Sequence, residues 1–360
     1  MFNTQKPYNQ LPLLPPKTEF ETVVVMKQLV RSHQALAELK GYAQTLPDQE
    51  ILINSVILQE AKDSSEIENI ITTNDELFKG IALQHDLSPQ VKEVLNYRSA
   101  LWEGFTFVRK KGFLSSNGIM TIQERLECNR QGIRKLPGTV LKNERTGKVI
   151  YTPPDQPDII QQLLKNLEEY LNTDIGKTDP LIKMAVAHYQ FESIHPFYDG
   201  NGRTGRIVNV LYLVLEKLLS SPILYLSRYI IRNKADYYRL LQEVRTKNKW
   251  TEWVLYMLRA IEETSRDTLY LINQIQAAMK ITADIIKEKQ TRKIYSKDLL
   301  ELLFEKPYVR VGNLVEKGIA SRNIAAKYLR MLEDAGIVRS KKKGRDVLYV
   351  NIRLFDILKK

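Results

Sequence analysis

The stretch His195-Pro196-Phe197-Tyr198-Asp199-Gly200-Asn201-Gly202-Arg203-Thr204-Gly205-Arg206 lies between two helical patterns and decides how the rest of the chain is interpreted. Before it, Asp179 and Pro180 predict a helix start, because an aspartate N-cap and a first-turn proline both favour that position. Apolar residues then recur at helical spacing as far as Phe191. We therefore expect a helix to lead directly into His195.

The segment after this stretch predicts a buried helix. Apolar residues surround nearly every side of it from Ile207 to Leu219, and Pro222 is expected to stop it. The turn Gly200–Gly202 should then lie at the N-terminus of this helix. Unpaired N–H groups and the positive end of the helix dipole favour an anion there, and flexible glycines let the backbone wrap around it.

The residue types in the stretch fit chemistry on a phosphate. An imidazole such as His195 can take a proton from a hydroxyl group. Asp199 offers hard oxygen atoms to Mg²⁺, and Arg203 and Arg206 offer forked donors to phosphate or carboxylate. Each residue alone could be an ordinary core, turn or surface residue. Together, so close in sequence, they predict a nucleotide-phosphate site.

At every fixed position the stretch resembles the signature of Fic-domain (Fic/DOC) proteins, His-Pro-Phe-x-Asp/Glu-Gly-Asn-Gly-Arg-x-x-Arg. Proteins of that family mostly transfer AMP from ATP to a Ser, Thr or Tyr hydroxyl of a target protein. The resemblance implies that His195 is the catalytic base and Asp199 the Mg²⁺ ligand. It also implies a set of ATP-binding residues: Gly200, Asn201, Gly202, Arg203, Thr204, Gly205, Arg206 and, further along the chain, Tyr238. In this set Arg203 would hold the β-phosphate side and Arg206 the γ-phosphate.

A second motif lies far upstream. Ser64-Ser65-Glu66-Ile67-Glu68-Asn69 closes an apolar helical run that begins near Ile51, and it resembles the inhibitory Ser/Thr-x-x-x-Glu-Gly/Asn motif of the same family. Ser64 and Glu68 are one helical turn apart, so both project from one face. The resemblance implies that Glu68 pairs with Arg206 in the place of the γ-phosphate. The alternative is a solvated helix end.

Residues 132–152 predict a β-hairpin whose turn is formed by Arg145-Thr146-Gly147-Lys148 and which ends at Pro153-Pro154. The resemblance implies a flap that pairs with the target segment by strand addition. An ordinary hairpin that covers the core is the alternative.

Tyr237 and Tyr238 lie on a predicted helix, and the resemblance places Tyr238 beside the adenosine. A tyrosine pair on a helix can equally be part of the core. Arg245 stands where some relatives have an asparagine near the adenine, which leaves the base specificity open.

Composition sets the outer limits. At 360 residues the chain should form about two or three domains. Its one cysteine, Cys128, excludes an internal disulfide and is compatible with a reducing cytosol. Met1–Lys17 lacks a signal-peptide pattern, and no stretch has the length and apolarity of a membrane span. We therefore expect a cytoplasmic protein without membrane partners.

The net charge of +12 is concentrated near one end: Thr291–Lys360 holds 17 Lys or Arg and 8 Asp or Glu. Helices are predicted to start at Ser296, Val311 and Ser321. Two strands, Ile337–Ser340 and Val347–Asn351, should follow. The pattern resembles a winged helix-turn-helix with 321–334 as recognition helix and the Lys343-Gly344 turn as wing. Such a module could bind DNA or another protein.

We thus expect a mainly α-helical protein with four parts. Residues 1–105 form a helical region that carries the inhibitory motif, and 106–263 a Fic-like helical core with a small β-hairpin flap. Residues 264–290 form a helical connector or homodimer face, and 291–360 a winged-helix domain. The leading hypothesis is a self-inhibited protein adenylyltransferase that uses ATP and Mg²⁺. Alternatives are transfer of another phosphate-linked group, removal of AMP with Glu68 aligning a water, a DNA-binding regulator whose core senses nucleotide, and a scaffold without turnover.

Overall fold

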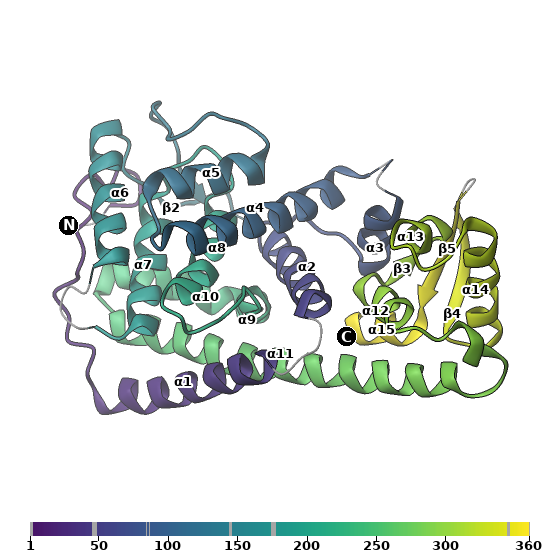
Figure 1. The fold of residues 1–360 in the computed structure, drawn as a ribbon. Coiled ribbons are helices and arrows are strands. Elements are labelled where there is room, and N and C mark those ends of the chain that lie inside the picture. Colours follow the sequence, from purple (N-terminus) through teal and green to yellow (C-terminus); the bar gives the residue numbers. More distant parts are fainter. Residues whose placement is uncertain are drawn as a thin grey trace.

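The computed structural model describes residues 3–44, 49–83, 85, 87–143, 146–173, 178–343 and 346–359. It confirms a mainly helical protein with two small antiparallel sheets. A larger helical body and a smaller C-terminal domain are joined by α11, a helix of 38 residues that runs along both (Figure 1). The boundary expected at residue 263 falls inside this helix. No helix within the described ranges combines the length and apolarity needed to cross a membrane.

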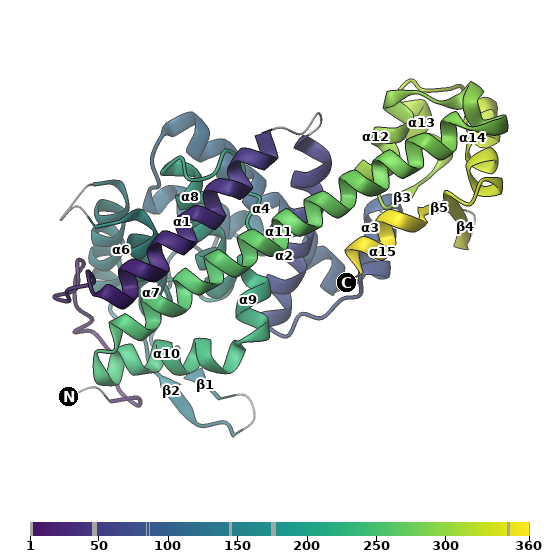
Figure 2. The ribbon, with the colours of Figure 1, turned by 90° about the horizontal axis from the view of Figure 1, so that it is seen from below.

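The chain before the C-terminal domain contains helices and one hairpin: α1 (Val23–Gln44), α2 (Gln49–Ile67), α3 (Asn74–Leu83), α4 (Pro89–Lys111), α5 (Ser116–Glu127), β1 (Leu141–Lys142), β2 (Val149–Tyr151), α6 (Pro157–Asn172), α7 (Pro180–Ile194), α8 (Asn201–Leu215), α9 (Leu226–Arg232), α10 (Lys234–Lys247) and α11 (Trp250–Lys287). Two views show α1 alongside the first half of α11 (Figures 1 and 2). The β1–β2 hairpin projects beside α10 (Figure 2).

Helices α7 and α8 form the centre of the body. Asp179 caps α7 by accepting a hydrogen bond from the Leu181 N–H (2.8 Å), as its sequence predicted. Every residue from Leu181 to Ile194 is buried, and α8 is buried from Asn201 to Val214. The site therefore rests on two helices that are packed on all sides.

Helix α8 is shorter than the sequence suggested. It ends at Leu215, whereas its apolar pattern and Pro222 predicted a helix through Leu219. Lys217 takes a left-handed conformation (φ 57°), and the Leu219 N–H donates back to the Leu213 carbonyl oxygen. Such a turn satisfies the carbonyl groups at the end of a helix, and it lets Leu219 return to the core.

Helix α2 is fixed to its neighbours by a buried carboxylate. Glu60 accepts hydrogen bonds from the Tyr97 hydroxyl on α4 (3.0 Å) and from the Ser227 N–H at the start of α9 (2.9 Å). Burial raises the pKa of Glu60 to about 7, although these hydrogen bonds lower it. Helix α2 ends at Ile67, and Asn69 follows it with φ of 62°.

The C-terminal domain contains the helices and strand pair that its sequence predicted, together with two further elements. Its elements are α12 (Lys297–Glu305), β3 (Tyr308–Val309), α13 (Val311–Glu316), α14 (Arg322–Asp334), β4 (Val338–Lys343), β5 (Asp346–Asn351) and α15 (Ile352–Leu358), preceded by a 3₁₀ turn (Lys289–Ile294). Neither β3 nor α15 was expected. The sheet order is β3-β5-β4. Gly344 and Arg345, at the tip of the expected wing, lie outside the described residues.

The C-terminal domain contacts the N-terminal helices. The Leu358 carbonyl oxygen accepts hydrogen bonds from Gln59 Nε2 on α2 (2.7 Å) and from Asn74 Nδ2 on α3 (2.8 Å). Lys341 on β4 lies 3.1 Å from the carboxylate of Asp75. The end of the chain thus lies beside α2 (Figure 1).

Candidate active site

The loop between α7 and α8 is closed by an asparagine side chain. After Ile194 the chain turns at His195, which has a left-handed conformation (φ 49°). Asn201 then exchanges two hydrogen bonds of 2.8 Å with the backbone of Phe197. The buried Asn201 amide therefore orders the loop and faces the backbone of Phe197.

A carboxylate lies at the N-terminus of α8, where the sequence predicted an anion. Gly200 caps the helix with φ of 74°, a conformation that glycine adopts without strain. A Cβ atom on Gly202 would overlap Oε1 of Glu68. The absence of a side chain at Gly202 thus lets this carboxylate approach the first turn of the helix, where N–H groups and the helix dipole favour negative charge.

Arg206 holds this carboxylate and the end of α2. Its Nη2 atom donates to Glu68 Oε1 (2.9 Å) and to the Ser64 carbonyl oxygen (2.9 Å), and its Nε atom donates to Ser64 Oγ (2.7 Å). Burial opposes ionisation of Glu68, but the attraction and hydrogen bond of Arg206 outweigh it and lower the pKa of Glu68. The contact is therefore an ion pair at neutral pH.

Arg203 is engaged by two carboxylates that sequence reasoning missed. It donates from Nη1 to Glu93 on α4 (2.5 Å) and from Nη2 to Glu127 at the end of α5 (2.8 Å). Burial raises the pKa of Glu127 to about 7 despite the attraction of Arg203. No local motif marks these glutamates, which lie far from Arg203 in sequence.

His195, Glu68, Gly202 and Tyr238 line one cavity of about 490 Å³. Residues of the hairpin region, of α7 and of α10 complete its wall: Val140, Leu141, Lys142, Asn143, Ile150, Tyr151, Glu192, Lys234, Leu241 and Arg245. Tyr238 is 46% exposed, whereas its neighbour Tyr237 is buried. The structure thus brings the upstream motif, the loop and Tyr238 together.

The remaining predicted residues lie around this cavity. Asp199 is exposed on the loop. Thr204 is buried within α8, and Gly205 faces the buried side chains of α7, where a Cβ would lie 2.9 Å from Glu192 Oε1. Gly205 thus allows the close packing of α8 against α7.

The imidazole of His195 is suited to accept a proton. Burial, and next the positive charge of Arg134, lower the pKa of His195 to about 4, while the carboxylate of Glu68 raises it. The ring is therefore neutral at neutral pH and has a basic nitrogen atom available for a hydroxyl proton.

The loop also offers one carboxylate that fits a magnesium ion. Asp199 Oδ1 accepts a hydrogen bond from the Gly200 N–H (2.7 Å), which orients the exposed carboxyl group beside the start of α8. In the described part of the chain no three His, Cys, Asp or Glu side chains gather to hold a metal. Because Mg²⁺ is commonly bound by one or two carboxylates plus phosphate oxygens, this single ligand fits a metal that arrives with a nucleotide.

The hairpin beside the cavity is shorter than predicted. Leu141 pairs with Tyr151 and Lys142 with Val149, and Arg145 at its tip lies outside the described residues. Residues 132–140 form no strand; instead the Arg134 N–H donates to the Pro196 carbonyl oxygen (2.9 Å). Contacts with the loop thus replace strand pairing. We refer to residues 132–154 as the flap segment.

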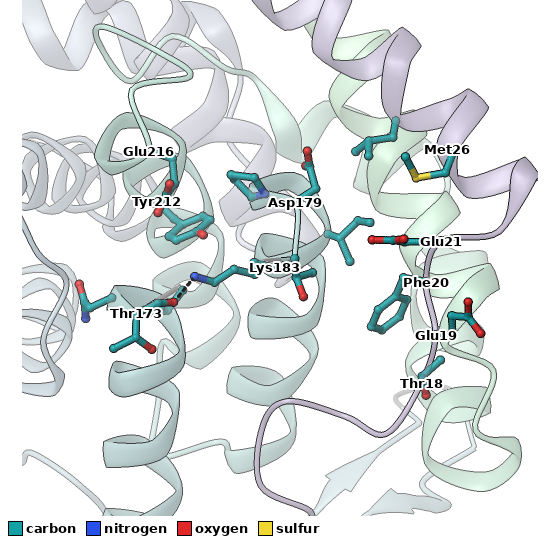
Figure 3. Close-up of a pocket in the computed structure, with 16 residues that line it drawn as sticks. Thr18, Glu19, Phe20, Glu21, Met26, Thr173, Asp179, Lys183, Tyr212 and Glu216 are labelled. Carbon is teal, nitrogen blue, oxygen red and sulfur yellow. Dashed lines mark hydrogen bonds between the residues drawn. The ribbon is translucent and has the colours of Figure 1, made fainter. Parts of the chain in front are cut away.

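A second cavity, of about 1010 Å³, lies between the N-terminal segment and the helices α6, α7 and α8 (Figure 3). The buried Lys183 reaches across it to the Thr173 carbonyl oxygen (2.8 Å), while Phe20 faces it from the opposite side (Figure 3). None of the predicted site residues lines this cavity, so the cavity beside His195 is the candidate active site.

Three segments of the chain match models of protein families, and all three models describe Fic proteins. Residues 26–106 match the N-terminal domain of the Fic/DOC family, and residues 113–213 match the Fic/DOC family domain itself. Residues 278–354 match the C-terminal domain of the SoFic-like protein adenylyltransferases.

Among curated proteins, the chain is 28% identical over 171 residues to protein adenylyltransferase fic-1 of Caenorhabditis elegans. The aligned region covers 46% of this chain and 31% of that protein. It is 32% identical over 93 residues to protein adenylyltransferase Fic of Drosophila yakuba. This aligned region covers 25% of this chain and 19% of that protein. The chain thus matches about a third or less of the length of these relatives.

Two solved structures share the fold. A Fic family protein from Desulfovibrio desulfuricans superposes with a TM-score of 0.58 at 19% identity, over 93% of this chain and 98% of that one. The C. elegans Fic-1 structure superposes with a TM-score of 0.54 at 20% identity, over 69% of this chain and 74% of that one.

Proposed function

The chain belongs to the Fic/DOC family, and on that premise we propose that it is a protein adenylyltransferase that moves AMP from ATP to a Ser, Thr or Tyr hydroxyl of a target protein. One observation carries this proposal. A neutral histidine and an anion site at a helix N-terminus line one cavity beside a hairpin, and the buried Arg206 binds the carboxylate of Glu68 that faces this cavity. The names of the relatives support the same activity.

In the proposed reaction the target hydroxyl loses its proton to His195 and attacks the α-phosphorus of ATP. A bond forms between this oxygen and phosphorus as the bond to the β-phosphate oxygen breaks, and pyrophosphate leaves. The N–H groups at the start of α8 stabilise the charge that develops on the phosphates. Most of the rate enhancement would come from positioning and from this preorganised polar site.

The predicted site residues other than Thr204 and Gly205 have the following parts in the proposed reaction. Asp199 would hold Mg²⁺, which would neutralise phosphate charge when bound. The backbone of Gly200–Gly202 would receive the α- and β-phosphates, and Arg206 the γ-phosphate. Tyr238 would lie beside the adenosine. Arg203 would act near the β-phosphate from a position fixed by Glu93 and Glu127.

We further propose that Glu68 inhibits the enzyme. Its carboxylate lies against Gly202 and binds Arg206, so it competes with a nucleotide phosphate for both the helix N-terminus and the guanidinium. Release of Glu68 would be required before ATP can bind in a reactive pose.

Intact mass spectrometry after incubation with ATP and Mg²⁺ tests the function. We expect Glu68→Gly to gain AMP masses and the double variant Glu68→Gly/His195→Ala to gain none, although it should still bind ATP. AMP transfer by the double variant would contradict the role of His195. Loss of AMP from a pre-modified protein, or a gain from another nucleotide only, would favour the alternative reactions.

A second candidate function concerns the C-terminal domain, which we infer to be a winged helix. Arg322, Lys327 and Arg330 are exposed on α14 and have no ion-pair partner among the described residues. Such a row of cations suits the phosphates of DNA. Lys341 on the expected wing is instead occupied by Asp75.

Salt-dependent binding to duplex DNA tests this second function. Replacing Lys327 and Arg330 by Glu should lower the salt slope by about two, the number of phosphate contacts removed. The exposed pair Lys110 and Lys111 on α4, replaced in the same way, is the control. Binding that does not respond to salt would exclude this candidate.

A further inference from the structure

Four consecutive carbonyl groups, those of the last two residues of α7 (193–194) and of the first two residues of the loop after it (195–196), all accept hydrogen bonds from the flap segment. Arg134 supplies three of the bonds and Tyr151 the fourth. The Tyr151 hydroxyl donates to Ser193 (2.6 Å), and Arg134 donates from Nη2 to Ile194 (3.2 Å), from Nε to His195 (2.7 Å) and from its backbone N–H to Pro196 (2.9 Å).

These carbonyl groups need such partners. The last carbonyl groups of a helix have no donor within the helix, and when they are buried each unsatisfied group costs free energy. The left-handed turn at His195 ends α7 abruptly, so the chain cannot supply further helical N–H groups. A positive charge at a helix C-terminus also interacts favourably with the helix dipole. Arg134, only 1% exposed, meets both needs.

Arg134 also holds the other end of the flap segment. Its Nη2 atom donates to the carbonyl oxygen of Pro154, which follows β2. One guanidinium therefore bridges the base of the hairpin and the loop that carries His195. The hairpin wall and the imidazole face the same cavity, so this bridge sets their separation.

We propose that Arg134 is a positioning residue that holds the His195 loop and the base of the flap as one rigid unit. The proposal rests on the proposed function in taking His195 as the base. Its consequence is that the target hydroxyl, presented at the flap, and the imidazole meet at a fixed distance. Arg134 itself is not among the residues that line the cavity beside His195.

Only arginine fits this position. A guanidinium presents five N–H donors in a planar fork and can address several carbonyl groups at once, whereas an ammonium group is a point charge on a flexible stem. Arg134→Lys should therefore keep the positive charge but lose the geometry. Arg134→Gln should lose both the positive charge and the hydrogen-bond geometry of the guanidinium.

The charge of Arg134 has a separate effect on His195. The charged groups that influence His195 are Arg134 in the flap segment, Arg245 on α10 and Glu68 after α2. Both arginines lower the pKa of His195, and Glu68 raises it. Comparing Arg134→Lys with Arg134→Gln therefore separates the effect of the hydrogen-bond geometry at residue 134 from the effect of its charge.

Transfer kinetics in the Glu68→Gly background form the first test. With Arg134→Lys we expect kcat to fall by roughly ten- to a hundredfold, because a misplaced base costs that much, while the KM for ATP stays close to that of the parent. Arg98→Gln, which removes a half-buried guanidinium on α4 that bonds Asn54, is the matched control for a general loss of stability. A kcat within twofold of the parent in Arg134→Lys, or an equal fall in the control, would overturn the proposal.

Nuclear magnetic resonance gives a test that does not depend on activity. With ¹³C-labelled histidine, and His195→Ala to assign the signal, Arg134→Gln should raise the pKa of His195, because a nearby cation that lowers it is lost. Arg134→Lys should change it little, yet the amides of His195 and Phe197 should exchange faster in both variants. Unchanged amide exchange in both would overturn the proposal. If Glu68→Gly transfers no AMP at all, the proposed function fails, and these exchange data alone decide the role of Arg134.

Discussion

Arg206 and Glu68 form an unequal pair: the side chain of Arg206 is 1% exposed, whereas that of Glu68, 2.9 Å away, is 36% exposed. The guanidinium is also held by the hydroxyl and carbonyl oxygens of Ser64. Arg206 is therefore the fixed partner, and Glu68 is the one that can move to solvent. In the proposed inhibition, release would therefore involve movement of Glu68, while Ser64 holds Arg206 in place.

Replacement of Glu68 by Gln should activate the enzyme less than replacement by Gly. Gln removes the charge but keeps a side chain against Gly202, so part of the anion site stays covered. We expect self-modification with ATP to rise in the order wild type, Gln, Gly, as measured by intact mass over time. Equal rates in the three proteins would remove Glu68 from regulation.

Loss of the Ser64 hydroxyl should not activate the enzyme. Ser64→Ala removes a buried hydrogen bond to a charged group, which costs about 1.5–3 kcal/mol of stability. In the Glu68→Gly background it should also slow transfer, because Arg206 loses its alignment. Denaturant unfolding and transfer rates check both parts. Faster transfer in Ser64→Ala/Glu68→Gly would show that Ser64 restrains Arg206 instead of positioning it.

A methyl group at Gly202 should block the anion site. Its Cβ would overlap Oε1 of Glu68 and lie 2.9 Å from Nη1 of Arg206, in the space that a phosphate would take in the proposed function. In the Glu68→Gly background we expect Gly202→Ala to weaken ATP binding by roughly tenfold, the equivalent of one or two lost hydrogen bonds. Calorimetric titration measures the affinity. Gly41→Ala, at an open helical position on α1, tests for a general effect of adding a methyl group.

The pH profile of transfer should lack a histidine transition near neutrality. A base must be deprotonated to act, and the pKa of His195 is about 4, so the acid limb of kcat should lie below about pH 5. Glu68→Gly should move this limb lower still, since Glu68 raises the pKa of His195. Single-turnover rates between about pH 4 and 9 provide the measurement. A fall in kcat centred between pH 6 and 7 would indicate a more exposed imidazole.

The buried carboxyl of Glu60 should make stability depend on pH. Its folded-state pKa, about 7, lies above the usual value of 4.5, so its contribution is present at low pH and is lost as pH rises through about 7. Relative to Glu60→Gln, the wild type should lose on the order of 3 kcal/mol between about pH 5 and 8. Denaturant unfolding checks this trend. As a control, Glu38→Gln on the exposed face of α1 should leave the pH dependence of stability the same as in the wild type.

The sequence by itself determined the helices and the identity of the loop between them. The N-cap Asp179, the glycines at 200 and 202, and the spacing of Ser64 and Glu68 are local signals, because caps, turns and helix faces depend on neighbours within a few residues. The end of α8 at Leu215 escaped detection, because its turn depends on how Leu219 packs and not on Pro222.

Tertiary structure alone decided which side chains share the site. Arg206 meets Glu68 across 138 residues, and Arg203 meets Glu93 across 110. For the first pair the sequence offered a resemblance to follow; for Glu93, Glu127 and Arg134 it offered none. Burial and hydrogen-bond partners from distant segments set whether a carboxylate is ionised or a histidine is neutral, and these follow from packing, which no local pattern encodes.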